Sequence, residues 1–523
     1  MNTLLILFAD KKSDYLFDKC FDSQSAFERS VLWAKNTISK LKGSIAVFAH
    51  KAIFSKVQEA LSSLSVDAEI VTLENWTIQD LFTNMSQAAI KNNAANVLYA
   101  WADQPFINEE LTKEIYSTHT EYKAEYTFAD GYLSGMTPEM LDTEACGILS
   151  KLCETKDLAK NAVSRESVFD FLKLDINSFE VETVVGPEDF KLYRIALNTS
   201  DKAGLTLCKN IFEKKLQDNS PLEFAKKVCN ATECLKTIPS YYNIQISGKR
   251  NCSPIYEPDN KAIFGDFYMP FEKVKELIHK INEFSNKAVI SLSLWGEATC
   301  HPDFEKIIEE ILKFPGLSIL VETDGYLITD ALCQKIKQAL DSCPEGTNQY
   351  ERLMWIVRID SATKETYQLI NKSDGYEKAV NAVTILSKYF TGTVYPQLVR
   401  MNENEEELEA FYRFWSNPQN VTGGKVIVQK YSTFCGVLKD KKPADLSPID
   451  RNPCWHLRRD MNILADGSVP LCREVLNSQI QGNVFTEDLQ TIWKKTDQEI
   501  SKHINKTYSA QCEKCDEYYT FNF

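Results

Sequence analysis

A regular alternation of strand-like and helix-like segments fills the second half of the chain and constrains its fold more than any other feature. Six runs rich in apolar and β-branched residues are predicted strands, at 242–247, 288–294, 317–322, 353–360, 393–401 and 425–431. Amphipathic segments lie between them, at 270–285, 302–313, 328–341, 374–390 and 403–415. A strand and a helix in every 40 residues or so are typical of a parallel sheet that curls into a barrel. We therefore predict an α/β fold with a (β/α)6 barrel or partial barrel.

Short polar sequences follow several of these predicted strands, at the end where parallel barrels carry their functional groups. "WGEATCHPDF" comes after the second strand, "ETDGY" after the third, and the fourth ends in "RIDSA". The loop after the first strand, "ISGKRNCSPIYEPDNKAIFGD", contains a single cysteine, Cys252. Cys300 and Cys435 are interpreted as buried structural cysteines, because an isolated thiol behaves as a small hydrophobic group.

The C-terminal part of the chain contains four cysteines in a spacing typical of metal binding. Cys454 and Cys472 flank "ADG" (465–467), which is predicted to be the turn of a hairpin. Cys512 and Cys515 follow in "CEKC", so the pattern is C-x12-G-x4-C, a gap, and C-x2-C. Four thiolates provide a complete tetrahedral ligand set for one metal centre. We therefore predict that these four residues bind a metal.

A separate alternation of strands and helices occupies the N-terminal part. Four buried strands are predicted from "TLLILFA", "SIAVFA", "AEIVTL" and "ANVLYAWA", with helices at 23–41, 54–64 and 77–92 between them. This pattern predicts a parallel sheet covered on both faces, with ligands beyond the carboxyl ends of its strands. Asp103 lies at such an end, in "YAWADQPFINEEL". We interpret Asp103 as the cap of the following helix, a common role for aspartate.

These four strands resemble the nucleotidyltransferase fold of sugar-nucleotide and cytidylyl transferases. "FEVETVVGPEDFKLYRIAL" (179–197) is similar to the closing strand and helix of that fold. In that family an aspartate at the position of Asp103 helps to hold Mg²⁺ and nucleotide phosphates. The family's first loop is rich in glycine and wraps the triphosphate, whereas "FADKKSDYLFDKC" has no glycine. The resemblance therefore implies a vestigial nucleotide and Mg²⁺ site at Asp103.

The loops of the second half resemble those of radical S-adenosylmethionine enzymes. In that family a glycine–glutamate motif after the second strand binds the amino group of the methionine moiety. Gly296 and Glu297 match the motif, with Trp295 in place of its usual first glycine. The family's first loop holds a 4Fe–4S cluster through C-x3-C-x2-C, and the lone Cys252 cannot supply three thiolates. The resemblance implies an S-adenosylmethionine site at Gly296 and Glu297, and we expect no cleavage there because the electron comes from that cluster.

The C-terminal cysteine pattern resembles the SPASM domain, an auxiliary-cluster module found behind many radical S-adenosylmethionine peptide-modifying enzymes. The full module has seven cysteines and two clusters, whereas this version has enough for one. The resemblance implies a single 4Fe–4S cluster bound by Cys454, Cys472, Cys512 and Cys515. Zinc is the competing metal, because four thiolates fit it equally well.

The order of the parts is similar, over essentially the whole chain, to that of the spirochaete family called spiro-SPASM proteins. The resemblance implies a nucleotidyltransferase-like domain at 1–197 and a connector at 198–236. It also implies a radical-type partial barrel at 237–450 and a SPASM domain at 451–523. That family is defined by its architecture, so the resemblance supplies no reaction.

Charge and cysteine content exclude several classes of protein. Acidic residues outnumber basic residues 73 to 59, and a net charge of −14 argues against a nucleic-acid partner, which needs clustered Lys and Arg. The first apolar run, in "MNTLLILFADKKSDY", is too short for a signal-peptide core, and no run reaches the length of a membrane span. The 15 scattered cysteines do not form the even, closely spaced framework of a secreted protein. We therefore expect a cytoplasmic protein with reduced thiols.

Three functions are compatible with the sequence. The first is an iron–sulfur protein of unassigned reaction, with one auxiliary cluster and a degenerate primary cluster loop. The second is a radical-type maturase that modifies a peptide or cell-envelope precursor. The third is a nucleotide-sugar-processing transferase that uses Asp103, with the barrel as an accessory. The substrate (a peptide, a protein or a small molecule), the redox partner and the oligomeric state do not follow from the sequence.

Overall fold

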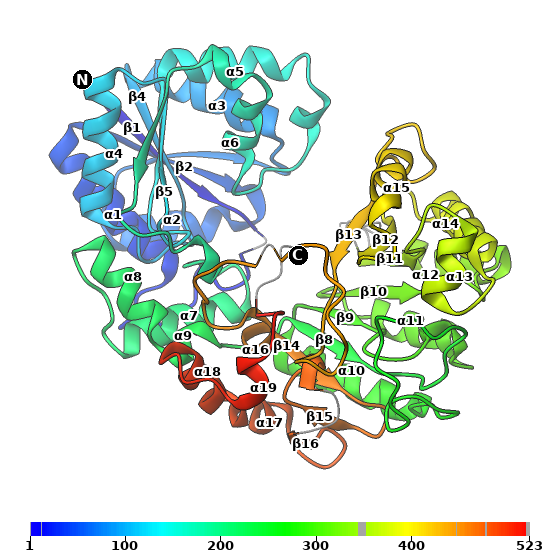
Figure 1. Ribbon diagram of the computed structural model, residues 1–523. Coiled ribbons are helices and arrows are strands. Elements are labelled where there is room, and N and C mark those ends of the chain that lie inside the picture. Colours follow the sequence, from blue (N-terminus) through cyan, green and yellow to red (C-terminus); the bar gives the residue numbers. More distant parts are fainter. Residues whose placement is uncertain (1, 12, 344–351, 446, 476–478, 519–523) are drawn as a thin grey trace. The chain divides into compact units, whose positions relative to one another are not determined.

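The computed structural model describes residues 2–11, 13–343, 352–445, 447–475 and 479–518 (Figure 1). The chain divides into two compact units, Met1–Thr237 and Ile238–Phe523. The expected connector at 198–236 lies within the first unit, and the barrel shares the second unit with the C-terminal cysteines. None of the described helices combines the length and the apolar character needed to cross a membrane.

The first unit is built on a seven-stranded sheet in the order β3-β2-β1-β4-β6-β5-β7. Its strands are β1 (Thr3–Ala9), β2 (Gly43–His50), β3 (Glu69–Leu73), β4 (Asn96–Trp101), β5 (Tyr126–Asp130), β6 (Glu139–Asp142) and β7 (Val181–Val185). The four predicted strands, β1 to β4, form and run parallel. β6 is antiparallel to both β4 and β5, so the sheet is mixed. The connection between β5 and β6 is too short for the crossover that parallel neighbours require.

Helices connect these strands and extend the first unit beyond the sheet. They are α1 (Ala26–Leu41), α2 (Phe54–Ser63), α3 (Ile78–Lys91), α4 (Glu109–Tyr122), α5 (Thr143–Cys153), α6 (Ser167–Leu172), α7 (Lys202–Glu213), α8 (Pro221–Cys229) and α9 (Thr232–Leu235). Capping boxes at Ser25 and Thr77 fix the starts of α1 and α3. The predicted closing helix after β7 is only a 3-10 turn at Lys191–Tyr193, which ends where Arg194 adopts a left-handed conformation.

The second unit contains a curled, parallel half-barrel sheet in the order β13-β12-β11-β10-β9-β8-β14. Its strands are β8 (Tyr241–Ile244), β9 (Ala288–Ser291), β10 (Leu317–Thr323), β11 (Leu353–Arg358), β12 (Val394–Arg400), β13 (Ile427–Lys430) and β14 (Asp460–Ile463). The six predicted barrel strands all form. β14, from the cysteine-rich part of the chain, adds a seventh strand beside β8.

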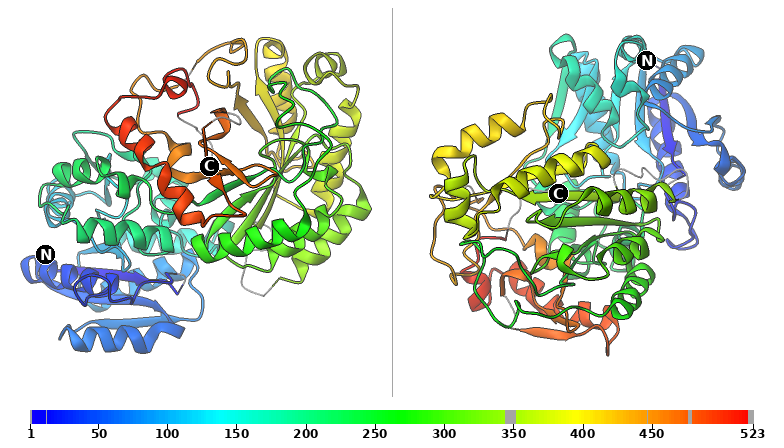
Figure 2. Two further views of the ribbon diagram at one scale, coloured as in Figure 1. Left: turned by 90° about the horizontal axis from the view of Figure 1, so that it is seen from below. Right: turned by 90° about the vertical axis from the view of Figure 1, so that its right-hand side faces the viewer.

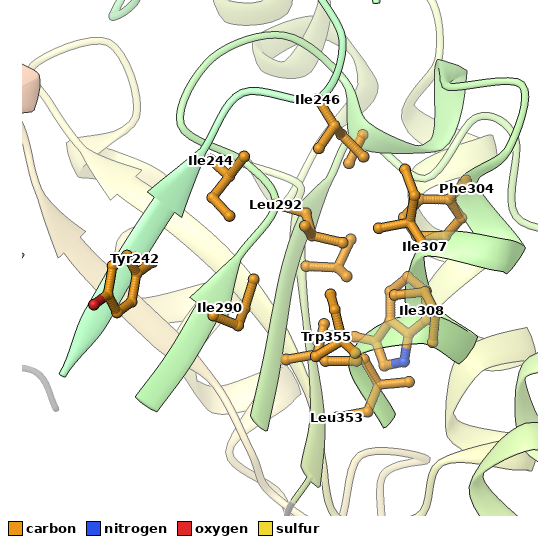
Figure 3. Close-up of a cluster of buried hydrophobic side chains, with 14 of the residues drawn as sticks. Tyr242, Ile244, Ile246, Ile290, Leu292, Phe304, Ile307, Ile308, Leu353 and Trp355 are labelled. Atoms are coloured by element: carbon orange, nitrogen blue, oxygen red, sulfur yellow. The ribbon is translucent and has the colours of Figure 1, made fainter. Parts of the chain in front are cut away.

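The helices of the barrel lie along one side of this sheet (Figure 2). They are α10 (Phe271–Ser285), α11 (Phe304–Leu312), α12 (Asp330–Asp341), α13 (Lys364–Asn371), α14 (Tyr376–Tyr389) and α15 (Leu408–Trp415). Of these, only α13 is not predicted from the sequence. Side chains such as Ile290, Ile308 and Trp355 fill the space between the sheet and these helices (Figure 3). This continuous core holds the strands in place, so the polar residues that follow each strand are fixed by it.

The cysteine-rich part forms α16 (Trp455–Arg459), β15 (Ser468–Pro470), β16 (Ile480–Asn483), α17 (Leu489–Lys495), α18 (Asp497–Ile504) and α19 (Ala510–Glu513). A turn forms at the predicted position, where Leu464 N donates to Ser468 O at 2.8 Å. The two arms of the predicted hairpin nevertheless belong to different sheets. β14 pairs with the edge strand β8, and β15 pairs antiparallel with β16.

Candidate functional site

Gly296 and Glu297 lie after β9, against the loop that follows β8. Gly296 has a φ of +76°, and a Cβ at this position would lie 2.1 Å from Ser247 O. The backbone N–H of Glu297 donates to Lys249 O at 2.6 Å. Only glycine allows so close an approach in this conformation. The two residues therefore fasten the first loop of the barrel to the second.

We expect Gly296→Ala to lower the free energy of unfolding by about 3 kcal/mol or more, since the strained φ costs about 1 kcal/mol and the clash about 1–3 kcal/mol further. Gly392 is a matched control, because its φ is +81° and a Cβ added there would meet no atom within 4 Å. Gly392→Ala should therefore cost only the first contribution. Urea unfolding of both variants measures the difference between their losses in free energy of unfolding. Equal losses would show that the clash with Ser247 O adds no cost.

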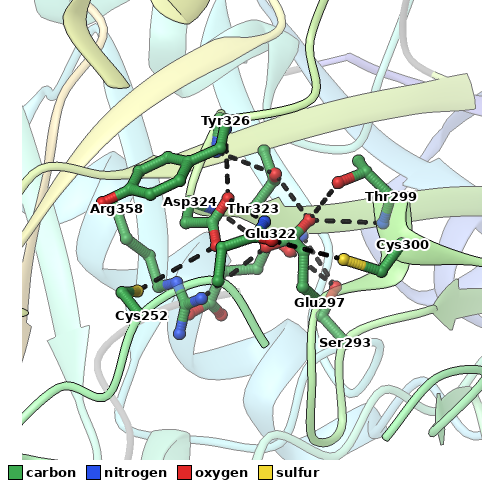
Figure 4. Close-up of polar contacts among 12 residues, drawn as sticks. Cys252, Ser293, Glu297, Thr299, Cys300, Glu322, Thr323, Asp324, Tyr326 and Arg358 are labelled. Atoms are coloured by element: carbon green, nitrogen blue, oxygen red, sulfur yellow. Dashed lines mark hydrogen bonds and ion pairs between the residues drawn. The ribbon is translucent and has the colours of Figure 1, made fainter. Parts of the chain in front are cut away.

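The Glu297 side chain is completely buried and its carboxylate is held by four donors (Figure 4). Oε1 accepts from Thr299 N at 3.2 Å, Thr299 Oγ1 at 2.6 Å and Thr323 Oγ1 at 2.7 Å. Oε2 accepts from Asp324 N at 2.9 Å. Burial raises the pKa of Glu297 to about 7, and the nearby Asp324 acts in the same direction. This carboxylate thus joins the loops after β9 and β10.

Arg358, at the end of β11, places a guanidinium among three carboxylates. Its Nη1 lies 2.5 Å from Glu257 Oε1, its Nη2 lies 3.7 Å from Glu297 Oε2, and its Nε lies 3.9 Å from Glu322 Oε1. The arginine side chain is only 8% exposed. The mouth of the barrel therefore already contains a positive charge next to the glutamate of the glycine–glutamate pair.

Asp360, two residues later in "RIDSA", organises the neighbouring loops. Its Oδ2 accepts from Tyr256 Oη at 2.9 Å, and its Oδ1 accepts from Val399 N at 2.9 Å. Burial raises the pKa of Asp360 to about 6. The aspartate links the loop after β8 to β12, a role that the sequence motif alone did not indicate.

Two thiols approach the mouth of the barrel. The buried Cys252 Sγ lies 4.0 Å from Asp324 Oδ2, and burial raises the pKa of Cys252 to about 12. Cys300 Sγ lies 3.6 Å from Asn251 Oδ1 and is only half-buried, so the prediction of a buried structural cysteine is wrong. Two separate thiols do not fit a cluster that requires three thiolates. The described residues at the mouth of the barrel therefore provide two separate thiols, Cys252 and Cys300.

The four C-terminal cysteines come together from separate elements. Cys454 precedes α16, Cys472 follows β15, Cys512 lies on α19 and Cys515 follows it. Burial raises the pKa of Cys454 and of Cys472, and the neighbouring thiols of Cys512 and Cys515 contribute to both shifts. A donor set of four thiols is soft and fits either an iron–sulfur cluster or zinc.

A fifth thiol, Cys435, lies beside this set. Its hydrogen bond with Cys515, together with burial, raises the pKa of Cys515. Cys435 is half-buried in a turn and has a φ of +56°, so its interpretation as a buried structural cysteine is wrong. Its separation from Cys454 resembles no ligand spacing, and sequence reasoning therefore had no signal of this proximity.

Asp103 follows β4 as expected but has a different role from the one predicted. The cap of α4 is Asn108, whose side chain accepts from Leu111 N at 3.0 Å, so Asp103 does not cap that helix. The helix begins beyond Pro105, too far along the chain for Asp103 to reach it. Asp103 is instead buried, and its Oδ2 accepts from Ser13 Oγ at 2.8 Å and from Arg165 Nη2 at 2.6 Å. The arginine neutralises the carboxylate that a Mg²⁺ ion would require.

Family models match two segments of the chain. Residues 252–414 match the radical SAM superfamily, where SAM is S-adenosylmethionine. Residues 454–516 match SPASM, described as an iron–sulfur cluster-binding domain. The second match spans all four C-terminal cysteines.

Two curated relatives are uncharacterized proteins of Treponema pallidum (strain Nichols). One is 35% identical over 365 residues, which cover 68% of this chain and 98% of that protein. The other is 27% identical over 139 residues, which cover 25% of this chain and 62% of that protein.

Solved structures with similarity to the chain include three of different kinds. Streptococcus suis SuiB is 14% identical, with 62% of this chain and 85% of that chain covered and a TM-score of 0.41. BtrN in complex with AdoMet and 2-DOIA is 13% identical, with coverages of 54% and 94% and a TM-score of 0.34. A cytidylyltransferase from Leptospira borgpetersenii is 15% identical, with coverages of 44% and 92% and a TM-score of 0.36.

Proposed function

Because the chain belongs to the radical SAM superfamily and carries a C-terminal SPASM domain, we propose that it binds one 4Fe–4S cluster at its C-terminal cysteines and does not cleave S-adenosylmethionine. The two domains imply iron–sulfur clusters and S-adenosylmethionine as the cofactors of such proteins. The proposal assigns the cluster to Cys454, Cys472, Cys512 and Cys515.

The side chains at the mouth of the barrel support the second part of this proposal, that the protein does not cleave S-adenosylmethionine. In radical enzymes the glycine–glutamate motif receives the amino group of S-adenosylmethionine. Here the Glu297 carboxylate accepts four hydrogen bonds from the protein and faces the Arg358 guanidinium at 3.7 Å. The positively charged amino group of S-adenosylmethionine, placed beside Glu297, would be repelled by the Arg358 guanidinium. Together with the lone Cys252 of the first loop, this arrangement favours a site that has lost its original chemistry.

The spacing of the C-terminal thiols supports a cluster over a single zinc ion. With Zn–S bonds of about 2.3 Å, the sulfurs of a tetrahedral zinc site lie about 3.8 Å apart. No three of these four sulfurs, all of which belong to the described part of the chain, lie within 4.8 Å of one another. A cluster, whose thiolates are bonded to different iron atoms, tolerates this wider spacing. Bound there, it would supply one-electron redox chemistry or stabilise the local fold.

Arg451 holds α19, the helix that carries Cys512, in place. It donates from Nη2 to Cys512 O at 2.6 Å. Its guanidinium also lies over the rings of Tyr508, at 4.2 Å, and Tyr518, at 4.5 Å. These contacts support a site in which α19 is fixed close to Cys454 and Cys472 before a metal binds.

Metal analysis of the full chain, purified without oxygen and reconstituted with iron and sulfide, tests the cluster assignment. We expect about four iron atoms and four sulfides per chain, with little zinc. About eight iron atoms would indicate a second cluster and contradict the assignment to the C-terminal cysteines alone. Zinc without sulfide would contradict the iron–sulfur assignment itself.

Incubation of the reconstituted protein with dithionite and S-adenosylmethionine tests the catalytic part of the proposal. We expect no 5′-deoxyadenosine above the level of a protein-free control, because the barrel offers no cluster to deliver the electron. Glu297→Gln should leave this result unchanged. Formation of 5′-deoxyadenosine that is lost in Glu297→Gln would show that the barrel remains a radical enzyme.

A further inference from the structure

We propose that Glu499, His503 and Cys512 form a second metal site, which binds a single divalent ion of the zinc type. Cys512 also belongs to the cluster set, so an ion bound here competes with the cluster; that competition rests on the function proposed above. The site itself rests only on the geometry of the three side chains.

The three residues converge from two helices. Glu499 and His503 are four residues apart on α18, so they project from the same face of that helix. Cys512 reaches them from α19. One ligand atom from each residue lies within 4.8 Å of the other two. This is the one such group of three or more His, Cys, Asp or Glu residues in the described part of the chain.

Two of the three side chains present polar atoms that the protein leaves unsatisfied. Glu499 is 7% exposed and His503 is 1% exposed. Lys502 pairs with Glu499 Oε2 at 2.9 Å, but Glu499 Oε1 has no hydrogen-bond partner, and neither has His503 Nε2. Buried polar atoms without partners are rare and costly, so their occurrence together points to a missing ligand. A metal ion would satisfy both at once.

The ligand chemistry favours a borderline metal. A carboxylate oxygen, an imidazole nitrogen and a thiolate are the three ligand types that zinc uses, whereas magnesium and calcium prefer oxygen alone. The carboxylate and the thiolate together balance the charge of a divalent ion. The Ser509 hydroxyl interacts with both Glu499 and Cys512 and would complete a four-coordinate site directly or through water.

Metal binding at His503 also affects Cys454, a second cluster residue. His503 Nδ1 accepts the backbone N–H of Cys454 at 3.4 Å. Ligation through Nε2 moves the ring proton to Nδ1, which can then no longer accept that hydrogen bond. The contact is long, so its loss costs little. An ion in this site therefore withdraws Cys512 from the cluster set and removes one contact of the segment that carries Cys454.

Zinc titration of the metal-free full chain, in competition with a chromophoric chelator, tests the site. We expect Glu499→Gln and His503→Ala to weaken zinc binding at least tenfold, and Cys472→Ser to leave it within about threefold of wild type. Glu513→Gln, on α19 but outside the trio, is the matched control. Unchanged zinc affinity in Glu499→Gln and His503→Ala would overturn the proposal, and so would loss of zinc binding in Cys472→Ser.

Cobalt(II) in place of zinc reports the number of thiolates through its sulfur-to-metal charge-transfer absorption. We expect one thiolate per ion, and a spectrum typical of four would overturn the site. Reconstitution with iron and sulfide shows whether the variants fold, since Glu499→Gln and His503→Ala retain the cluster ligands. Wild-type protein loaded with zinc first should then take up less iron than metal-free protein. If no variant forms a cluster, the proposed function fails, while the zinc and cobalt results still decide the second site.

Discussion

Cys472→Ser is expected to lose nearly all iron and acid-labile sulfide, from about four atoms of each per chain to below about one. Cys472 lies close to the other three C-terminal thiols, and a serine hydroxyl is a far poorer ligand for iron than a thiolate. Metal binding and local folding should also be coupled, because the four ligands come from separate short elements that the metal would join. Limited proteolysis should therefore cleave the variant after residue 451 sooner than wild type.

Cys252→Ser provides the matched control for this loss. It removes the thiol at the mouth of the barrel and leaves the C-terminal set unchanged. We expect it to retain the full iron and sulfide content. If Cys252→Ser instead lost half or more of the iron, a cluster in the barrel would be present and the proposed function would be wrong. Cys435→Ser tests whether the fifth thiol is a cluster ligand. We expect this variant also to retain the cluster, because the four assigned thiols remain.

The strands were the most predictable part of the fold. All six barrel strands and all four of the first N-terminal strands occur where apolar runs predict them. Buried parallel strands are almost continuously apolar, as in β1, whose residues are all buried, and such runs are visible without knowledge of their partners. The proximity of the four C-terminal cysteines was equally predictable, because two cysteines on either side of a turn and one C-x2-C pair have a recognisable spacing.

Contacts between distant segments were not predictable in this way. Asp103 pairs with Arg165, 62 residues further along the chain, and no local pattern indicates that partner. The same is true of β14, for which the sequence predicts pairing within a hairpin but which instead extends the barrel beside β8. A strand pattern indicates which residues are buried, whereas the choice of neighbour depends on which sheet edge remains open.

One feature of the sequence points to the proposed second metal site. "DQEISKHI" places Glu499 and His503 four residues apart on a short amphipathic helix. Such pairs are common on solvent-facing helices, where they are stabilised by charge and hydrogen bonding alone. Only the structure shows that this face is buried and that Cys512 folds back onto it.

Arg358→Met is expected to destabilise the barrel by about 3–5 kcal/mol, because it leaves buried carboxylates without their cation. The guanidinium is 8% exposed, and Glu297, which it faces, is fully buried. Hydrogen exchange of peptides from β9 to β11 measures the loss where it occurs. Arg400→Met is the matched control, since Arg400 pairs with Glu405 in a setting where the two side chains are 30% and 36% exposed. Its removal should cost less than about 1 kcal/mol.

The pH dependence of this defect identifies its cause. The pKa of Glu297 is raised from 4.5 to about 7 in the folded protein, so between these values the folded state binds more protons than the unfolded state. Stability contributed by Glu297 therefore falls as pH rises through this range. Loss of Arg358 raises that pKa further, and the defect should be larger at pH 8 than at pH 5. Glu257→Gln added to Arg358→Met should restore part of the stability. A defect independent of pH would instead assign the role of Arg358 to packing of its side chain rather than to charge.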